Sequence, residues 1–476
     1  MTELPKDFAA RMQDMLGSAY PAFVRSYEKQ KVHALRVNTL KGSVEEFMEK
    51  APFFDRTKIR RVPWERSGFY YDEDMAFGKH PFHEAGVYYI QEPSAMTPVS
   101  YLGAQPGEKI LDLCAAPGGK STQIASYMKN EGLLVCNEIH PARAKILSEN
   151  VERMGIKNAL VTNEAPEKLS ELFGAYFDRI LVDAPCSGEG MFRKNEESRG
   201  EWSLENVRLC ADRQDTILDC ADLMLRPGGR LVYSTCTFAP EENEGSVARF
   251  LERHPEYEIV KVEKYEGMAG GRAVWTGGRN VKNIEDTVRL FPHLTDGEGH
   301  YLAVLQKAGE VPSGYRGFLR NGLQKGILAK EVKEVLAFQD ENLEGNRNKK
   351  LLEEQDERLL RFGEQLYLMP QDMPCIRQLK VLRAGLHLGT LKKNRFEPSH
   401  ALALALAKDG VRRSMELCPD GGKSDMSVIN AYLNGQTLNC EGEKGWYLMT
   451  CNGYSIGWGK LAGQIMKNHY PKGLRK

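Results

Sequence analysis

The sequence lacks the features by which several protein classes are recognised. No run of eighteen or more apolar residues occurs, and the first residues, MTELPKDFAARMQDML, carry acids where a secretory signal would have an apolar core. We therefore expect a cytoplasmic chain that spans no membrane. None of the ten cysteines stands in a paired CxxC motif, which argues against a zinc ribbon and against a secreted disulfide framework. We expect no bound metal.

Net charge is absent as well. The 65 basic side chains balance 65 acidic ones, so a polyanionic partner would have to bind local basic patches. The chain shows no internal repeat at a solenoid period. Its 41% hydrophobic and 27% charged residues are typical of globular proteins, and 476 residues exceed what one hydrophobic core usually organises. The length predicts two to four domains.

Short apolar runs alternate with helical stretches between residues 86 and 307. The runs are KILDLC, GLLVCNEI, NALVTN, RILVDAP and GRLVYSTC. Strands that alternate with helices predict an α/β domain, in which a doubly wound, mostly parallel sheet has helices on both faces.

Three further segments flank this predicted domain. Residues 1–85 combine a helical start with a basic, β-branched stretch, KVHALRVNTLKG, and predict a small α+β module. Residues 308–390 are interpreted as a linker and a small third module, with the polar stretch 331–364 as helical surface. Residues 391–476 end in a compact β module, whose strand-and-turn pattern is clear from about Leu438.

A glycine-containing turn follows the first run of the predicted sheet, in KILDLCAAPGGKSTQIA, and a helix is expected to start near Ser121. A strand, turn and helix in this order let backbone N–H groups approach a ligand at the carboxyl edge of a sheet. Glu138, at the end of the second run, lies where an acid would hold a ribose. A phosphate-binding Walker loop is the alternative, but it requires glycine where this chain has Cys114. A tight turn without a ligand is the other alternative.

Two cysteines follow the next strands of the predicted sheet. Asp183 ends one strand and is followed by Cys186, and Cys236 ends another. Because neighbouring parallel strands end at one edge of a sheet, we expect both thiols and the carboxylate to face the same crevice as the glycine turn. A single cysteine in a strand is most often an inert buried thiol, and the combination of two thiols with an acid argues for an active site.

The chemistry that suits such thiols is covalent catalysis. Carbon 5 of a pyrimidine is a poor nucleophile, but addition of a thiolate to carbon 6 makes carbon 5 able to attack a sulfonium methyl group. An acid near N3 of the ring would neutralise charge during the attack. The residues alone leave open which thiol attacks.

Four motifs resemble those of the Nop/Sun family of RNA cytosine-5 methyltransferases. They are QEPSAM at 91–96, CAAPGGK at 114–120, DAPCSGEG at 183–190 and STCT at 234–237. The segments FEPSHALALAL and GWGK…KNHYPKGLR resemble the C-terminal extension of the bacterial branch that methylates 16S ribosomal RNA near the decoding centre. The resemblance covers essentially the whole chain. It implies a Rossmann-like S-adenosylmethionine-dependent methyltransferase core and a C-terminal PUA-like module that binds RNA.

The resemblance also implies residue roles. Cys236 would be the nucleophile, Cys186 would assist release of the methylated RNA, and Asp183 and Lys120 would contact the target base. In DNA cytosine-5 enzymes the Pro-Cys thiol attacks, so in a DNA methyltransferase the two cysteines would exchange roles. The cofactor would be held by the glycine turn and by acids after the strands: Cys114, Ala115, Ala116, Pro117, Gly118, Gly119, Lys120, Glu138 and Asp183.

The sequence departs from the family pattern after the third strand. Many relatives carry an acid before a small residue there, whereas this chain reads VTNEAPEKL. Either Asn163 or Glu164 would contact the adenine end of the cofactor, and the register stays open.

A methyltransferase of this kind must flip its target base out of the stack and hold the RNA backbone on basic surface. The first module is therefore expected to face the RNA, and Trp458 and Tyr470 in the C-terminal cluster are expected to stack on bases. The basic candidates are Arg25, Lys29, Lys31, Arg36, Lys41, Lys58, Arg60, Arg61, Arg193, Lys194, Lys460, Lys467, Lys472, Arg475 and Lys476.

The expected substrate is 16S ribosomal RNA, free or within the 30S subunit, and the protein is expected to act as a monomer. Three alternatives remain: a tRNA cytosine-5 methyltransferase, a ribosome assembly factor without activity, and a DNA cytosine-5 methyltransferase. Retention of both thiols favours an active RNA enzyme over an inactive scaffold.

Overall fold

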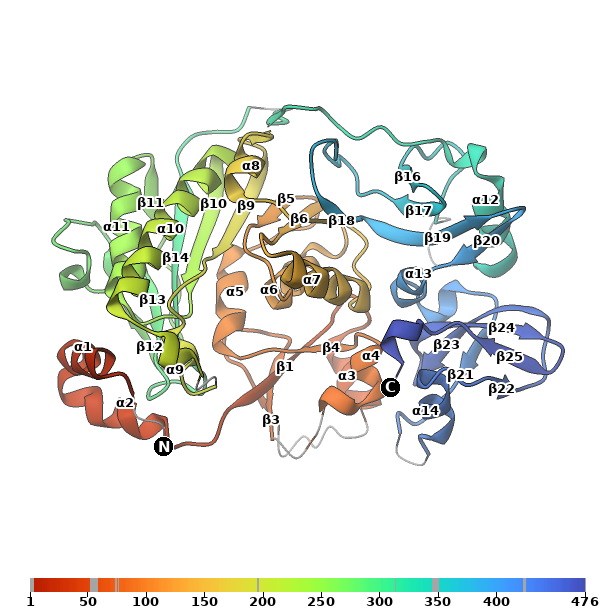
Figure 1. The fold of residues 1–476 in the computed structure, drawn as a ribbon, viewed down its shortest axis with the longest axis horizontal. Helices are drawn as coiled ribbons and strands as arrows, with labels where there is room; N and C mark the ends of the chain where they lie inside the picture. The colour runs from red at the N-terminus through yellow and green to blue at the C-terminus, as the bar shows by residue number, and fades with distance from the viewer. Residues whose placement is uncertain are drawn as a thin grey trace.

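A ten-stranded sheet forms the centre of the molecule (Figure 1). The structure is a computed structural model that describes residues 4–51, 59–72, 75, 77–194, 197–312, 314–344, 351–422 and 425–475. Five neighbouring strands of the sheet run parallel. In spatial order they are β10 (Leu225–Thr235), β9 (Phe177–Asp183), β5 (Lys109–Asp112), β6 (Leu133–Asn137) and β7 (Ala159–Thr162). They coincide with the five apolar runs of the sequence, so the predicted fold class is confirmed.

These strands are apolar because helices cover both faces of the sheet. Every residue of β6 and β7 is buried. One face packs on α5 (Thr97–Leu102), α6 (Gly119–Met128) and α7 (Pro141–Arg153). The other face packs on α8 (Pro166–Ser170), α10 (Leu204–Met224) and α11 (Glu244–Arg253). Helix α6 begins two residues before the predicted start near Ser121, because Gly118 adopts a left-handed φ of 113° and serves as the N-cap.

Antiparallel strands extend the sheet at both edges. Beside β10 lie β14 (His300–Lys307), β13 (Val288–Leu290) and β12 (Met268–Gly270), while β11 (Tyr257–Ile259) also pairs with β14. At the other edge β18 (Val381–Ala384) pairs with β7. The segment that follows residue 307 therefore returns to complete the central sheet.

The N-terminal part has a helical pair and a small sheet. Helices α1 (Lys6–Leu16) and α2 (Tyr20–Ser26) lie beside α9 (Glu197–Glu201), at the opposite side of the molecule from the C-terminal strands (Figure 1). The sheet has the order β2 (Arg60–Arg61), β3 (Gly68–Tyr71), β1 (His33–Val37) and β4 (Tyr88–Ile90), with α3 (Val44–Lys50) and α4 (Pro81–Glu84) nearby. Because β4 pairs with β1, this sheet continues past residue 85.

The C-terminal part has two further sheets and three helices. The first sheet contains β16 (Leu359–Phe362), β17 (Gln365–Leu368), β19 (Leu386–Lys392) and β20 (Arg395–Pro398). The second contains β21 (Ser414–Glu416), β23 (Gly445–Cys451), β24 (Tyr454–Ala462), β25 (Ile465–Asn468) and β22 (Leu438–Asn439). The helices are α12 (Lys333–Asn342), α13 (His400–Ala405) and α14 (Ser427–Leu433), and a two-residue pair joins β8 (Phe173–Gly174) to β15 (Phe318–Leu319).

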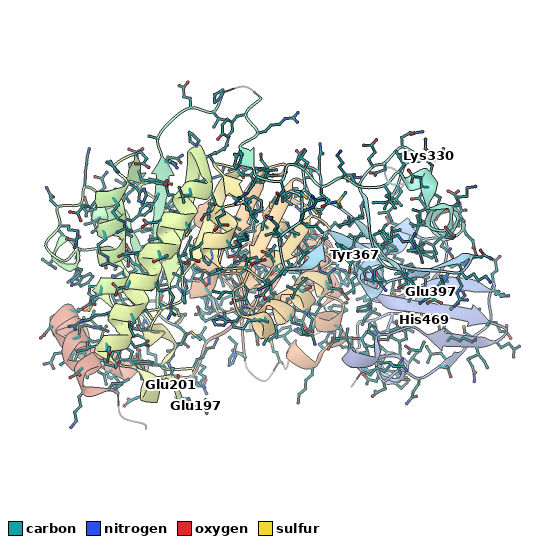
Figure 2. The ribbon with its side chains drawn as sticks, turned by 45° about the horizontal axis from the view of Figure 1, so that its top comes forward. Glu197, Glu201, Lys330, Tyr367, Glu397 and His469 are labelled. Carbon is teal, nitrogen blue, oxygen red and sulfur yellow. The ribbon has the colours of Figure 1, made fainter. Side chains whose placement is uncertain are left out.

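One prediction in this part is only partly confirmed. The polar stretch 331–364 was expected to be helical, but α12 ends at Asn342 and β16 occupies the end of the stretch. Residues 345–350 lie outside the described residues. Figure 2 shows Tyr367 of β17 where the central sheet meets the C-terminal strands. Within the ranges described, no helix combines the length and the apolar composition needed to cross a bilayer.

Candidate active site

The two cysteines lie in contact at the carboxyl ends of neighbouring strands. Strands β9 and β10 are parallel and pair Asp183 with Ser234, so the residues that follow both strands emerge at one edge. The sulfur atoms of Cys186 and Cys236 lie 3.3 Å apart. The backbone N–H of Gly190 donates to the carbonyl of Cys236 at 2.8 Å, which ties the turn after β9 to the turn after β10. The sheet register thus brings together the two thiols that the sequence places fifty residues apart.

Asp183 lies beside the thiols in a network of charged and polar groups. Its Oδ2 accepts from Lys120 Nζ at 2.7 Å, and its Oδ1 accepts from Ser234 Oγ at 2.8 Å. Burial alone would raise the pKa of the Asp183 carboxyl, but the Lys120 and His300 interactions and the hydrogen bond from Ser234 hold this pKa below its ordinary value. Burial also opposes the charge on Lys120, yet Asp183 raises the pKa of the ammonium above its ordinary value. The pair is therefore ionised at neutral pH.

His300 is a site residue that the sequence analysis missed. It begins β14, and its Nε2 lies 3.8 Å from Asp183 Oδ1. Burial and the nearby Lys120 charge lower the pKa of His300 to about 4, so its ring is neutral at neutral pH. Its Nε2 has no hydrogen-bond partner among the described residues. No motif marks this histidine. It comes near Asp183 only because β14 pairs antiparallel with β10, a strand far from it in the sequence.

Cys186 and Cys114 both have thiols whose pKa is raised. The hydrogen bond with Cys236, then burial, and then the charges of Cys236 and Glu242 raise the pKa of Cys186 well above its ordinary value. Cys186 is therefore a protonated thiol at neutral pH. Burial likewise raises the pKa of Cys114 well above its ordinary value, so Cys114 is an inert neighbour of the site.

The glycine turn is held in place by contacts from β6 and α7. The N–H of Ala115 donates to the carbonyl of Asn137 at 2.8 Å. Arg143 donates to the Ala116 carbonyl at 2.8 Å, and Asn150 donates to the Pro117 carbonyl at 2.9 Å. Helix α6 then begins at Gly119, and Lys120 in its first turn reaches across to Asp183. The turn and the cysteines therefore belong to the same site.

A cavity of about 620 Å³ opens between the turn and the thiols. This volume lies within the range of small-molecule sites. A second hollow of about 200 Å³ adjoins it, shares Cys114, Ala116 and Asp183 with it, and is lined also by Gln91, Glu92 and Lys120. The larger cavity is lined by residues of the turn, by the loops after β6 and β7, and by both thiols: Leu113, Cys114, Ala116, Asn137, Glu138, Ile139, His140, Arg143, Pro166, Glu167, Asp183, Ala184, Pro185, Cys186, Arg213, Thr216, Ile217 and Cys236.

The predicted cofactor residues divide into two groups. Glu138 lines the larger cavity, where its Oε1 accepts from the His140 N–H at 2.9 Å. Asn163 and Glu164 line neither hollow. The side chain of Asn163 donates to the carbonyls of Glu138 and Ile139, and Glu164 Oε1 accepts from the Lys380 N–H at 2.6 Å. The residues of that loop that reach the cavity are Pro166 and Glu167, which follow the predicted positions Asn163 and Glu164 by two residues or more.

Several predicted RNA-contacting side chains are buried instead. Arg36 is fully buried and donates to Gln91, Ser126, Thr122 and the carbonyl of Gly119, so it supports the site from behind. Arg193 is paired with Glu298 at 2.9 Å, with 5% and 2% of the two side chains exposed.

Predicted RNA-contacting side chains near the C-terminal module also make contacts within the protein. Lys41 donates to the Leu404 carbonyl, which joins the first module to α13. Trp458 and Tyr470 are only 2% exposed each, so the expectation that they stack on bases is wrong. Their rings are part of the apolar packing of this module, and Trp458 Nε1 donates to the Ser399 carbonyl at 2.9 Å.

Those of the remaining basic candidates that the structure describes are half-buried or exposed. Lys58 and Lys476 lie outside the described residues. Lys460 is half-buried and lies over the ring of Trp446 at 4.8 Å. The exposed candidates are Arg25, Lys29, Lys31, Arg60, Arg61, Lys194, Lys467, Lys472 and Arg475.

Comparisons with known proteins identify the family. A model described as 16S rRNA methyltransferase RsmB/F matches residues 99–306, and a model of the N-terminal domain of 16S rRNA methyltransferase RsmF matches residues 4–93. A model of the first C-terminal domain of the RsmF rRNA methyltransferase matches residues 344–406, and a model of the methyltransferase RsmF PUA domain matches residues 424–476. All four parts of the chain thus match one type of enzyme.

Relatives and solved structures agree with these models. Ribosomal RNA small subunit methyltransferase F of Erwinia tasmaniensis is 31% identical over 99% of this chain and 96% of that protein. The protein of the same name from Vibrio vulnificus is 31% identical over 99% of this chain and 97% of that protein. A methyltransferase homolog from Pyrococcus horikoshii is 30% identical, with a TM-score of 0.57 over 64% of this chain and 95% of that structure.

The cavity fits the cofactor of such an enzyme. Its volume, the small side chains of the turn and the carboxylate of Glu138 on its wall suit a nucleoside with a ribose and a sulfonium-bearing chain. The resemblance to the Nop/Sun family and the expected cofactor are confirmed. On this fold, this site and these matches, the chain belongs to the ribosomal RNA small subunit methyltransferase F family of S-adenosylmethionine-dependent methyltransferases.

Proposed function

We propose that this protein methylates carbon 5 of a cytosine in 16S ribosomal RNA, with Cys236 as the covalent nucleophile and Cys186 assisting release. The observation that carries this proposal is the contact between the two sulfur atoms, 3.3 Å apart on the wall of the cofactor cavity. Methylation of a nucleophilic oxygen or nitrogen needs no thiol, whereas carbon 5 needs covalent activation. A site with two thiols beside an ionised carboxylate therefore favours cytosine-5 chemistry.

The proposed reaction begins with Cys236. Its thiolate adds to carbon 6 of the cytosine, which forms a carbon–sulfur bond and moves the electron pair of the 5,6 double bond to carbon 5. S-Adenosylmethionine supplies the methyl group that carbon 5 takes up. A base then takes up the carbon-5 proton, the electron pair of the carbon–hydrogen bond re-forms the 5,6 double bond, and the carbon–sulfur bond breaks with its electron pair returning to the Cys236 thiolate.

Asp183 and Lys120 orient the base in this proposal. The ion pair at 2.7 Å holds the carboxylate in one position at the junction of the two hollows. There the carboxylate can accept a hydrogen bond from N3 of the ring when N3 carries the proton that the Cys236 thiol gives up, and this proton neutralises the charge that builds on the ring during the attack. Lys120 in turn keeps Asp183 ionised before the base enters.

The proposed substrate follows from the relatives. The matched models and the curated relatives are named as 16S or small-subunit ribosomal RNA methyltransferases. The PUA-type module supplies a second RNA-binding surface, on which Lys467, Lys472 and Arg475 are exposed. We propose a monomer that acts on the 30S subunit or on its free RNA.

The test uses variants of the two thiols in the full chain. Cys236→Ala is expected to abolish methyl transfer, because no sulfur remains to add to carbon 6. Cys186→Ala is expected to accumulate a covalent protein–RNA adduct, visible as a shifted band on a denaturing gel. Cys440→Ala, which changes a half-buried thiol outside both hollows, is the matched control and should leave transfer unchanged.

Two outcomes would contradict the roles proposed for the thiols. An adduct formed by Cys236→Ala would assign the attack to Cys186, as in DNA cytosine-5 enzymes. Full transfer by both variants would remove covalent catalysis. Bisulfite sequencing of total RNA from cells with and without the gene would locate the modified cytosine, and a change in tRNA alone would overturn the assignment to 16S ribosomal RNA.

A further inference from the structure

A buried carboxylate lies directly behind the two cysteine turns. Glu242 ends the short 3-10 turn Pro240–Glu242, and its side chain is fully buried. One of its oxygens accepts from the Ser187 N–H at 2.9 Å and from Gln214 Nε2 at 2.9 Å, and the other accepts from the Ser187 hydroxyl. The proposed chemistry gives this residue no role.

The Ser187 hydroxyl extends this contact to the second turn. Ser187 directly follows Cys186, and its Oγ lies 2.9 Å from Oγ1 of Thr237, which directly follows Cys236. Glu242 therefore reaches one turn directly and the other through a single hydroxyl. Asn243, the next residue, donates to the Thr237 carbonyl at 2.9 Å and accepts from Thr235. The residues after β10 thus hold both turns at once.

The carboxylate also contacts the two cysteine turns unequally. Its direct hydrogen bonds go to the residue after Cys186, and its charge acts on the Cys186 thiol. Other titratable groups around Cys186 include Cys236, which is in contact with it, Asp183 and Arg213, which line the same cavity, and Tyr233, whose hydroxyl donates to the Glu242 carbonyl. Burial raises the pKa of Glu242 itself to about 7, while its hydrogen bonds from Ser187 and Gln214 favour the charged form. Burying such a group is costly unless it is fully hydrogen-bonded, as it is here.

We propose that Glu242 is a positioning residue: it holds the two cysteine turns at contact distance and places a negative charge on the Cys186 side, so that Cys236 is the sulfur that attacks. This inference rests on the proposed function, because it explains how the two thiols acquire different roles. A purely structural role would also account for the burial of Glu242. The test must therefore report on the two thiols separately.

The first experiment compares two neighbouring glutamates. Glu242→Gln keeps the shape and removes the charge, and Glu241→Gln changes the adjacent side chain, which is 48% exposed. Both proteins are treated with iodoacetamide without RNA, and the labelling rates of Cys186 and Cys236 are measured by mass spectrometry across pH. Glu242→Gln should raise the labelling rate of Cys186 at pH 8, because it removes a negative charge that raises the pKa of this thiol. Glu241→Gln should match the wild-type protein.

Kinetics and a second variant separate positioning from folding. Glu242→Gln should lower kcat for methyl transfer at least about tenfold, with KM for S-adenosylmethionine changed by less than about twofold. Ser187→Ala removes the bridge but keeps the carboxylate, so it should lower kcat without raising the labelling of Cys186. If Glu242→Gln fails to fold, Ser187→Ala carries the test.

Three results would overturn the inference. One is unchanged labelling and turnover in Glu242→Gln. Another is an equal change in labelling of both thiols together with loss of cofactor binding, which would show a structural role only. The third is wild-type turnover by Ser187→Ala. The labelling needs no RNA, so full activity of Cys236→Ala would refute the proposed function whatever the labelling shows.

Discussion

Replacing Lys120 with methionine is the sharpest available perturbation of the site. The Nζ of Lys120 lies 2.7 Å from Asp183 Oδ2, and 12% and 28% of the two side chains are exposed. Methionine keeps the length and the apolar stem of lysine but removes the charge. Asp183 would keep the hydrogen bond from Ser234 at 2.8 Å and the neighbouring His300 ring.

The size of the effect follows from this geometry. A hydrogen bond to a charged group contributes about 1.5–3 kcal/mol, which corresponds to about one to two units in the pKa of Asp183. The sign is upward, because Lys120 is what offsets the burial that raises this pKa. Loss of the ammonium therefore lets Asp183 take up a proton at a higher pH than in the wild-type protein.

The pH profile of kcat/KM measures this shift, because it reports the titration of groups in the free enzyme. The step that belongs to Asp183 should move upward by about one to two pH units in Lys120→Met. Stability gives a second readout. In the wild-type protein the lowered pKa of Asp183 stabilises the fold above about pH 3.9, and this contribution is lost as the pH falls through the folded-state value. The difference in Tm between the two proteins should thus be larger at pH 7 than at pH 4.

Lys145→Met is the matched control, since Lys145 is exposed on α7 and lines neither hollow of the site. It should reproduce the wild-type profile. The reasoning is refuted if Lys120→Met folds, binds cofactor and shows a profile that superimposes on that of the wild-type protein.

Two further predictions concern packing. Arg289→Met should lower the free energy of unfolding by about 3–5 kcal/mol, because Glu244 would stay buried without its partner. The double variant Arg289→Met/Glu244→Gln should recover part of this loss in thermal denaturation. If it recovers none, the argument that the two residues stabilise each other as a pair is wrong. Trp458→Ala should lower the free energy of unfolding by about 3–5 kcal/mol, because the ring is buried. Lys467→Ala should leave Tm unchanged, because Lys467 is exposed, and should weaken RNA binding in a salt titration. If Trp458→Ala instead weakens RNA binding without lowering Tm, Trp458 contacts RNA after all.

The sequence predicted the central strands and the meeting of the thiols for related reasons. A parallel strand covered on both faces must be apolar throughout, so β6 and β7 stand out as continuous runs. Parallel neighbours end at one edge, so the residues after β9 and β10 had to share a crevice. Both arguments use only local pattern and sheet geometry.

Local pattern and sheet geometry could not predict the roles of residues whose partners lie far away in the sequence. Arg36 reads as surface charge in the sequence, yet its guanidinium is fully buried because Gln91, Ser126, Thr122 and the Gly119 carbonyl accept its hydrogen bonds. These partners lie 55 to 90 residues away. His300 and Glu242 were missed for the same reason.

The pairing of β18 with β7 has a consequence for synthesis of the chain. Thr162 ends β7, and its partner Val381 is translated more than two hundred residues later. At about 5–20 residues per second the ribosome needs about ten to forty seconds to deliver that strand. During this interval the edge of β7 offers unpaired backbone groups, which can join strands of other chains. The late arrival of β18 therefore leaves the nascent chain open to pairing with other chains until Val381 has emerged.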